Sequence, residues 1–181
     1  VKLVGIDLHW MVHVQGALEV ASEIRRLRPD IEIVFGGISS TYYARELIRY
    51  PFIDYVMRGY DTHAPMDALL RELKCQRRFD GIANLMWKEG RTLRENSFGH
   101  KPDAYSIGID WTTVPKDGER QSLPILEFLS TQNAGCAYNC GWCGGSREAF
   151  RRVFQRHKAM ARKPVEEIDY EMGCMNEVPN A

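Results

Sequence analysis

The sequence lacks several features that define whole classes of protein. Its 24 Lys and Arg residues are balanced by 24 Asp and Glu residues, so it has no basic excess of the kind used to hold nucleic acid or an anionic membrane surface. No apolar run approaches the roughly 18 residues that a membrane-spanning helix needs. The opening stretch VKLVGIDLHW carries neither a basic leader nor a cleavage site and is no signal peptide. We therefore expect neither a membrane nor a nucleic acid as partner.

Cysteine is scarce and unevenly distributed. The five cysteines are Cys75, Cys136, Cys140, Cys143 and Cys174. An odd number, with three crowded into one short stretch, fits a disulfide framework poorly. In a chain without export signals, closely spaced cysteines more often bind metal or act in redox chemistry. The cysteine pattern therefore predicts a reducing, cytoplasmic compartment.

The first part of the chain alternates between strand-like and helix-like hydrophobic patterns. Patterns typical of buried strands alternate with patterns typical of amphipathic helices, at the spacing of βαβ units. Such units form a parallel sheet with helices on both faces. The predicted strands cover residues 2–7, 31–35 and 55–58, and the predicted helices cover 16–28, 41–49 and 65–74.

The pattern changes after residue 75. Residues 84–87 and 92–94 flank Glu89-Gly90 and predict a β-hairpin. Residues 96–124 contain three prolines and no clear periodicity, so we interpret them as a linker. A buried strand is predicted at 125–131, followed by helices at 146–157 and 165–172. The expected organisation is an α/β domain over 1–95, a linker over 96–124 and a second domain over 125–181.

The cysteine motif follows the last predicted strand directly, in the stretch ILEFLSTQNAGCAYNCGWCGG. Cys136, Cys140 and Cys143 have the spacing Cys-x3-Cys-x2-Cys. Three thiolates within one loop can each bind one iron of a 4Fe–4S cluster, which leaves the fourth iron without a protein ligand. An open coordination position distinguishes a reactive metal site from a closed structural one. The alternative is a structural zinc site in which Cys75, Cys174 or His157 completes four ligands.

This loop resembles that of the radical S-adenosylmethionine superfamily. The resemblance rests on the cysteine spacing, the preceding strand, the aromatic Trp142 before the third cysteine, and Gly144-Gly145 after it. It implies that the three cysteines bind a 4Fe–4S cluster and that S-adenosylmethionine occupies the fourth iron. It also implies that Trp142, Gly144 and Gly145 lie beside the cofactors. Alternatively, Trp142 packs in a local core and the two glycines only form a turn.

The first domain resembles the cobalamin-binding domain of cobalamin-dependent radical S-adenosylmethionine proteins. The stretches that carry the resemblance are VKLVGIDLHW, IEIVFGGISSTYY and IDYVMRGYDTHAPMDALL. It implies an α/β fold with a partial Rossmann-like cobalamin-binding domain and a parallel sheet, followed by the start of a radical S-adenosylmethionine βα partial barrel. The opening strands of the first domain and most of the barrel are absent, so we expect the chain to be truncated at both ends.

The candidate cobalamin contacts lie where predicted strands end, because ligands of open parallel sheets bind outside the carboxyl ends of the strands. Glycines allow a flat group or a nucleotide tail to approach the backbone, and hydroxyls offer hydrogen bonds. The alternative is ordinary turn chemistry at strand ends. The candidates are Gly36, Gly37, Ser39, Ser40 and Thr41 after the second strand, with Arg58 and Gly59 after the third.

No histidine is assigned to cobalt. Cobalamin domains that ligate cobalt through histidine carry Asp-x-His-x-x-Gly, and here Val12 stands where that glycine should be. His9, Trp10 and His13 remain residues that can line the crevice or serve a structural role.

The resemblance implies an enzyme in which the cluster passes one electron to S-adenosylmethionine and so generates a 5′-deoxyadenosyl radical. With cobalamin, methyl transfer to an unactivated carbon is the usual outcome in the family. An electron donor such as flavodoxin or ferredoxin is implied. The substrate is not identified, because the later barrel strands and the family's Gly-Gly-Glu motif are missing, and we expect the fragment alone to be inactive. The alternative is a non-catalytic cobalamin-binding or iron–sulfur module.

Overall fold

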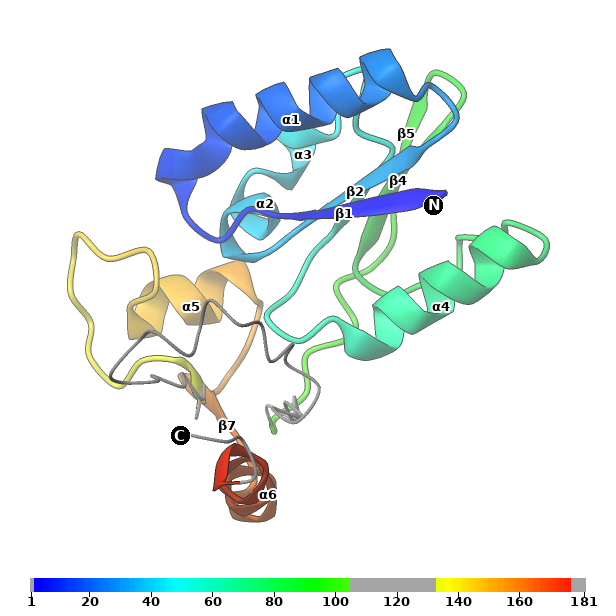
Figure 1. Cartoon of the computed structure of the whole chain (residues 1–181). Helices are drawn as coiled ribbons and strands as arrows, with labels where there is room; N and C mark the ends of the chain where they lie inside the picture. Colours follow the sequence, from blue (N-terminus) through cyan, green and yellow to red (C-terminus); the bar gives the residue numbers. More distant parts are fainter. Residues whose placement is uncertain (1, 105–132, 177–181) are drawn as a thin grey trace, which may run out of the picture. The chain divides into compact units, whose positions relative to one another are not determined.

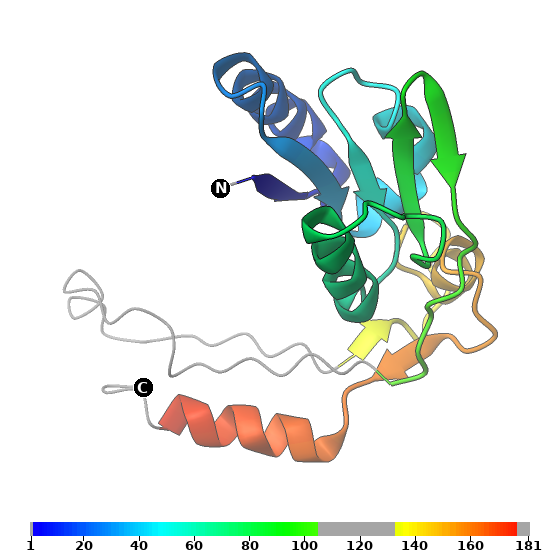
Figure 2. The same ribbon diagram turned by 90° about the vertical axis from the view of Figure 1, so that its right-hand side faces the viewer.

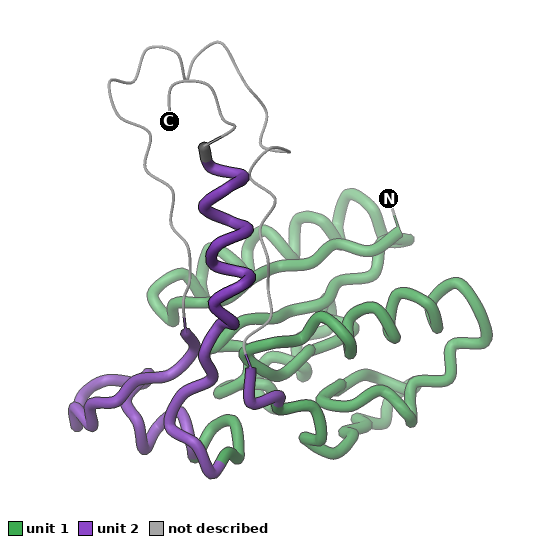
Figure 3. The backbone as a smooth tube through the Cα atoms, turned by 90° about the horizontal axis from the view of Figure 1, so that it is seen from below, with its two compact units in different colours: residues 1–101, 152–156 green, residues 102–151, 157–181 purple. Residues whose placement is uncertain are grey.

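The computed structural model describes residues 2–104 and 133–176, which fall into two compact units. Unit 1 comprises residues 1–101 and the short segment 152–156, and unit 2 comprises residues 102–151 and 157–181 (Figure 3). The first unit thus runs six residues past the boundary expected at residue 95. The strand expected at 125–131 and most of the expected linker lie outside the described residues.

Unit 1 is built on a five-stranded sheet with the order β1-β2-β3-β4-β5 (Figure 2). The first three strands are parallel, and the last two form the antiparallel hairpin that the Glu89-Gly90 turn predicted. The central strands β2 and β3 are largely buried on both faces, as expected for apolar strands covered by helices. The strands are β1 (Leu3–Asp7), β2 (Glu32–Gly36), β3 (Tyr55–Met57), β4 (Leu85–Glu89) and β5 (Thr92–Glu95).

Helices cover both faces of this sheet (Figure 1). One core joins the sheet to α1 and to the α2–α3 segment, through buried residues such as Ala21, Leu47 and Ile48. The second core, on the other face, joins it to α4 through Leu69. The α/β class predicted from the sequence is therefore confirmed. The helical elements are η1 (Met11–His13), α1 (Val14–Leu27), α2 (Ile38–Tyr42), α3 (Ala44–Leu47) and α4 (His63–Lys74).

The single helix predicted over 41–49 is wrong in its bounds. The chain forms two short helices instead, separated at Tyr43, and α2 begins at Ile38. Gly37 has φ +94°, which lets the backbone turn from β2 into α2 within one residue. Hydrophobic periodicity does not register such a turn, because it depends on backbone conformation and not on side-chain polarity.

Unit 2 contains β6 (Asn133–Gly135), α5 (Arg147–Val153), β7 (Met160–Arg162) and α6 (Val165–Asn176). Its two strands pair antiparallel, so the parallel βα barrel start is not evident in the described residues. The helix predicted over 146–157 ends early, at Val153, and Gln155 just beyond it has φ +50°. A buried ion pair of 2.6 Å between Lys163 and Glu171 fixes α6 to the residue after β7.

Candidate functional site

The predicted cobalamin contacts meet at one edge of the unit 1 sheet. Helix α2 lies just beyond the carboxyl ends of β1 and β2 (Figure 1). The Leu8 amide donates to the Gly36 carbonyl at 2.8 Å, and the Ser39 amide donates to the Leu8 carbonyl at 3.0 Å. We call this place, formed by residues 36–41 and 58–59, the cofactor edge.

Gly37 is required by the protein's own packing. A Cβ atom there would lie 2.2 Å from Asp7 Oδ1 and 2.9 Å from the Leu8 carbonyl oxygen. Its φ of +94° is also in the region that favours glycine. Ordinary turn chemistry, the alternative to a cobalamin contact, therefore accounts for a glycine at position 37 without any ligand. Gly36 differs, because a Cβ atom there would meet nothing within 4 Å.

Two of the three hydroxyls that were predicted to contact cobalamin form hydrogen bonds within unit 1. Ser39 Oγ donates to the His9 carbonyl at 2.9 Å. Thr41 Oγ1 donates to the Gly37 carbonyl at 3.0 Å and accepts from the Gly59 amide at 2.9 Å. This second pair of bonds ties the α2 turn to the turn after β3.

Ser40 behaves differently from its two neighbours. The residue is fully buried, and its Oγ has no hydrogen-bond partner among the residues described. A buried hydroxyl without a partner is costly unless something supplies one. Ser40 is therefore the one of the three predicted hydroxyls whose hydrogen-bonding capacity the described residues leave unused.

Arg58 is engaged within unit 1. Its guanidinium donates to the carbonyls of Asn84 at 3.1 Å and Asn96 at 2.6 Å, pairs with Glu95, and lies 5.5 Å from the centre of the Phe98 ring. Burial lowers the pKa of Arg58, and the charge of Glu95 opposes that change. These contacts give Arg58 a structural role, and its contact with a cofactor stays a prediction.

We expect Arg58→Met to lower the free energy of unfolding by about 3 kcal/mol, because it leaves the Asn96 carbonyl without its described donor and removes the more buried of the two arginines that pair with Glu95. Chemical denaturation of the purified protein measures this. Arg45→Met is the matched control, since Arg45 also pairs with Glu95, at 3.1 Å, but its side chain is 74% exposed. We expect a change of about 0.5 kcal/mol or less for that exposed pair. Equal effects of the two substitutions would contradict the structural role of Arg58.

Sequence reasoning missed the role of Asn84. This fully buried residue has φ +66° and pairs its side-chain amide with the backbone of His100, at 2.7 and 3.0 Å. His100 Nε2 in turn lies 3.7 Å from the buried Asp61 carboxylate. Asn is one of the few residues that tolerate positive φ, and this was the available signal, although Asn84 was predicted as the first residue of a strand that in the structure begins at Leu85. These contacts fix residues 96–100 against the turn after β3.

The cysteine loop of unit 2 starts at β6 and ends at α5. Cys136 is half-buried, while Cys140 and Cys143 are exposed. The Tyr138 amide donates to Cys136 Sγ at 3.4 Å, the type of bond that a cluster thiolate also accepts. Trp142 is 90% exposed, so the alternative in which it packs in a local core does not describe this structure.

The two glycines after the third cysteine are not crowded by neighbouring atoms. A Cβ atom at Gly144 would meet nothing within 4 Å, and one at Gly145 would come no closer than 3.9 Å, to Cys143 Sγ. Among residues 2–104 and 133–176, no three His, Cys, Asp or Glu side chains are gathered as metal ligands. The three thiols therefore lie on one accessible loop, but they are not gathered into a metal site. Their number, type and access fit an iron–sulfur cluster.

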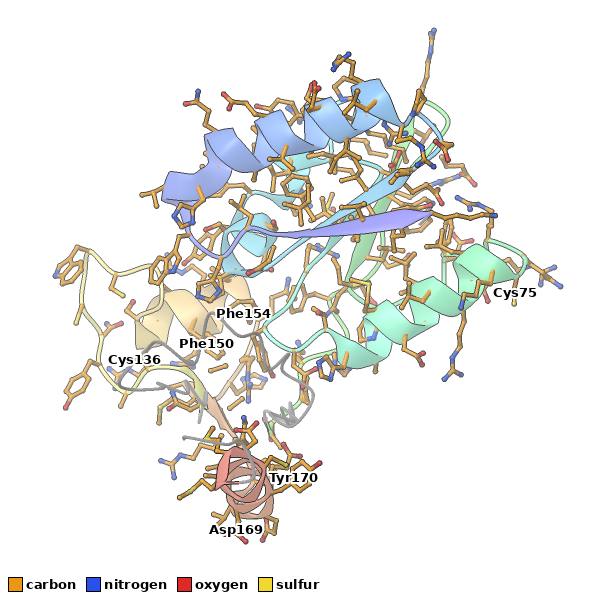
Figure 4. All side chains as sticks on the ribbon, viewed as in Figure 1. Cys75, Cys136, Phe150, Phe154, Asp169 and Tyr170 are labelled. Atoms are coloured by element: carbon orange, nitrogen blue, oxygen red, sulfur yellow. The ribbon has the colours of Figure 1, made fainter. Side chains whose placement is uncertain are left out.

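The other two cysteines lie elsewhere in the fold. Cys75 follows the last residue of α4 in unit 1 and is exposed (Figure 4). Cys174 is buried on α6. Neither belongs to the loop that carries Cys136, Cys140 and Cys143, and their exclusion as ligands stays a prediction.

Comparison with known proteins finds a family model that matches part of the first unit. The sequence profile of the B12 binding domain matches residues 1–69, the stretch that contains β1 to β3 and the candidates of the cofactor edge. An anaerobic magnesium-protoporphyrin IX monomethyl ester cyclase of Synechocystis sp. is 26% identical over 127 residues, which are 67% of this chain and 24% of that protein.

Two solved structures share the fold. The radical S-adenosylmethionine methyltransferase TsrM from Kitasatospora setae has a TM-score of 0.62 at 21% identity, over 94% of this chain and 34% of its own. The cobalamin-dependent S-adenosylmethionine radical enzyme OxsB has a TM-score of 0.56 at 15% identity, over 96% of this chain and 23% of its own. The chain thus spans about a quarter to a third of these proteins.

Unit 1 is an open α/β domain, and its residues 1–69 match the model of the B12 binding domain. The B12 binding domain match and the fold shared with two radical S-adenosylmethionine enzymes agree with the resemblance seen in the sequence. No helix within the described part of the chain is both long and apolar enough to cross a bilayer.

Proposed function

We propose that this chain carries the cobalamin-binding and cluster-binding parts of a radical S-adenosylmethionine enzyme. The observation that carries the proposal is the presence, in one chain, of a B12-binding domain and an accessible Cys-x3-Cys-x2-Cys loop. When bound, the cluster supplies one electron to S-adenosylmethionine and so releases methionine and a 5′-deoxyadenosyl radical.

In this proposal the cysteines, the glycines and the tryptophan of the loop have different roles. Cys136, Cys140 and Cys143 hold the cluster through thiolates, and their spacing leaves one iron open for S-adenosylmethionine. Gly144 and Gly145 give that cofactor room against the backbone, since neither position is crowded. Trp142 is exposed and available to cover the cluster from water.

At the cofactor edge, Ser40 and Gly36 are the residues that we propose to contact a cobalamin tail. Ser40 has a buried hydroxyl without a described partner, and a Cβ atom at Gly36 would meet nothing within 4 Å. Ser39, Thr41 and Gly59 shape the turns around them through the bonds described above. No histidine of this chain ligates cobalt in this proposal.

Methyl transfer to a carbon of an unidentified substrate is the reaction we propose. Its support is the fold shared with a radical S-adenosylmethionine methyltransferase. An electron donor such as flavodoxin or ferredoxin and a reducing, cytoplasmic compartment belong to the same proposal, because the cluster must be reduced before each turnover.

The alternative is a cobalamin-binding or iron–sulfur module without catalysis. Anaerobic incubation of the reconstituted full-length protein with S-adenosylmethionine and a reductant separates the two. The enzyme releases methionine from S-adenosylmethionine, whereas a module binds its cofactors and leaves S-adenosylmethionine intact. Intact S-adenosylmethionine in the fully loaded, reduced protein would contradict catalysis.

Ser40→Ala is expected to weaken cobalamin binding about fivefold, because it removes one buried hydrogen-bonding group from the cofactor. The free energy of unfolding without cobalamin should change by less than about 0.5 kcal/mol, since the hydroxyl has no described partner to lose. Titration of the full-length protein with cobalamin, followed by absorbance, measures the affinity.

His9→Ala is the control for this titration. The His9 carbonyl, which accepts the bond from Ser39, is retained in that variant. The bound cobalamin spectrum should therefore be the same as in the unchanged protein. A changed cobalt spectrum in His9→Ala would show that this histidine ligates cobalt, against our assignment.

A further inference from the structure

The zero net charge of the chain conceals a local excess of positive charge towards its carboxyl end. Residues 147–163 contain seven Lys and Arg residues and a single acidic residue, Glu148. Helix α6, which follows in the sequence, has four acidic residues and no basic one. Positive and negative charge are therefore separated along this part of the chain.

Two arginines of helix α5 are exposed and nearly without partners. The two lysines of the basic stretch are already paired with carboxylates, at 2.6 and 2.7 Å. Arg147 is exposed, and its side chain has no partner among the described residues. Arg151 is also exposed, and its one described partner is Glu148, at 3.7 Å. Positions four apart lie on the same face of a helix, so these two residues of unit 2 place two cations on one exposed face.

The stability of α5 does not explain this placement. Arg147 is the first residue of the helix, where the helix dipole favours a negative charge. Arg147 and Arg151 are also like charges four positions apart, which destabilises a helix slightly. Two unfavourable effects on a helix of only seven residues indicate a role outside the helix.

The exposed face of α5 begins at the cysteine loop, which runs directly into the helix (Figure 1). The Arg147 amide donates to the Tyr138 carbonyl at 2.8 Å, and the Ser146 amide donates to the Cys143 carbonyl at 3.1 Å. Tyr138 stands between the first and second cysteines of the motif. One backbone hydrogen bond therefore joins Arg147 to the stretch that carries the candidate cluster ligands.

Tyr138 adds an exposed aromatic ring to this part of unit 2. The residue is 75% exposed. Tyr and Arg are among the residue types that contribute most to binding at protein interfaces. Redox encounters between proteins use small interfaces, so a surface of few residues is sufficient for them. We call Tyr138, Arg147 and Arg151 the basic loop face.

We propose that the basic loop face docks an acidic one-electron carrier protein that reduces the cluster. The inference rests on the proposed function, in which the loop holds a cluster that must be reduced before each turnover. One electron leaves the carrier, which is oxidised, and enters the cluster, which is reduced, and no covalent bond forms or breaks. Complementary charge steers such a partner to its site, and the position of this face brings the carrier to the cysteines.

A nucleic acid is the other polyanion that binds to arginines and an exposed aromatic ring. A nucleic-acid site neutralises many phosphates, typically along a basic groove. Here two arginines on one short helix are followed in the chain by the acidic helix α6. The described residues therefore favour a protein as the partner.

Binding of an acidic flavodoxin to the full-length protein without cofactors tests this surface. We expect Arg147→Glu and Arg151→Glu each to weaken the binding about tenfold at low salt, because each places a like charge against the acidic partner. The difference should shrink at high salt, where exposed charges are screened. Tyr138→Ala should also weaken the binding, through the loss of its ring. Isothermal titration calorimetry measures these affinities.

The charge reversal at Arg147 separates docking from folding. A Glu at the first position of a helix is favourable for the helix, so Arg147→Glu should unfold at the same temperature as the unchanged protein or higher, while its affinity for flavodoxin falls. Arg91→Glu is the matched control, because it makes the same change in net charge at an exposed residue of the turn between β4 and β5 in unit 1. Its affinity should be that of the unchanged protein. Equal affinities of the Arg147, Arg151 and Arg91 variants overturn the proposal.

Reduction of the reconstituted protein gives a second measurement. Flavodoxin should reduce the cluster about tenfold more slowly in the two α5 variants, whereas dithionite should reduce it at the unchanged rate. Slower reduction by both reagents would show that the arginines act on the cluster itself and would overturn the docking role.

Two further outcomes are decisive. If the unchanged protein does not bind flavodoxin, the proposal is overturned, and binding of a single-stranded RNA oligonucleotide that the same variants lose then assigns the surface to nucleic acid. If the unchanged protein takes up no iron, the proposed function fails, and the flavodoxin titration of the cofactor-free protein still decides whether the basic loop face docks the carrier.

Discussion

Replacing Cys136, Cys140 and Cys143 together by Ala is expected to take the reconstituted protein from about four irons per chain to none. The three thiols lie on one loop and supply every protein ligand that the proposed cluster has. The brown chromophore should disappear with the iron. Metal analysis and absorbance spectra after anaerobic reconstitution of the full-length protein measure both.

Cys75 and Cys174 provide the control for this experiment. Cys75→Ser changes an exposed residue, and Cys174→Ala removes only a thiol from a buried position, where an added hydroxyl would be costly. Both variants should keep the full iron content. A large loss of iron in either would show that the ligand set extends beyond the loop. Stoichiometric zinc with no uptake of iron would identify the structural zinc site instead.

Gly37→Ala is expected to lower the free energy of unfolding by about 4 kcal/mol. In a marginally stable protein, a loss of this size prevents unit 1 from folding. The added Cβ would meet Asp7 Oδ1 at 2.2 Å and the Leu8 backbone at 2.9 Å, while φ stays at +94°. Backbone cannot move aside cheaply at this point, because Leu8 and Gly36 are hydrogen-bonded to each other. Thermal and denaturant unfolding measure the loss.

Gly36→Ala is its control. A Cβ atom at Gly36 would meet nothing within 4 Å, so the free energy of unfolding should change by no more than about 0.5 kcal/mol. Any loss of cobalamin binding in Gly36→Ala then reports on the ligand, whereas a loss in Gly37→Ala reports on the fold. Similar stabilities of the two variants would contradict the packing argument for Gly37.

Much of unit 1 follows from the sequence because its signals are local. The apolar runs of β1 to β3, the periodicity of α1 and α4, and the Glu89-Gly90 turn each depend on residues within one element. These are the patterns that hydrophobic burial and turn chemistry impose directly. The antiparallel pairing of β6 with β7 joins residues far apart in the chain, and no local pattern indicated it.

The sequence by itself determined the α/β class, the resemblance to cobalamin-binding radical S-adenosylmethionine proteins and the three candidate cluster cysteines. Only the tertiary structure distinguished the residues of the cofactor edge from one another. Gly37 is fixed by Asp7, thirty positions earlier, and Arg58 by the backbone of Asn84 and Asn96, while Ser40 alone keeps a hydroxyl with no described partner. Likewise, Tyr60 accepts a hydrogen bond from Arg156, 96 positions later in the chain. Such roles depend on which atoms the fold brings into contact, and residue type and spacing carry no record of those contacts.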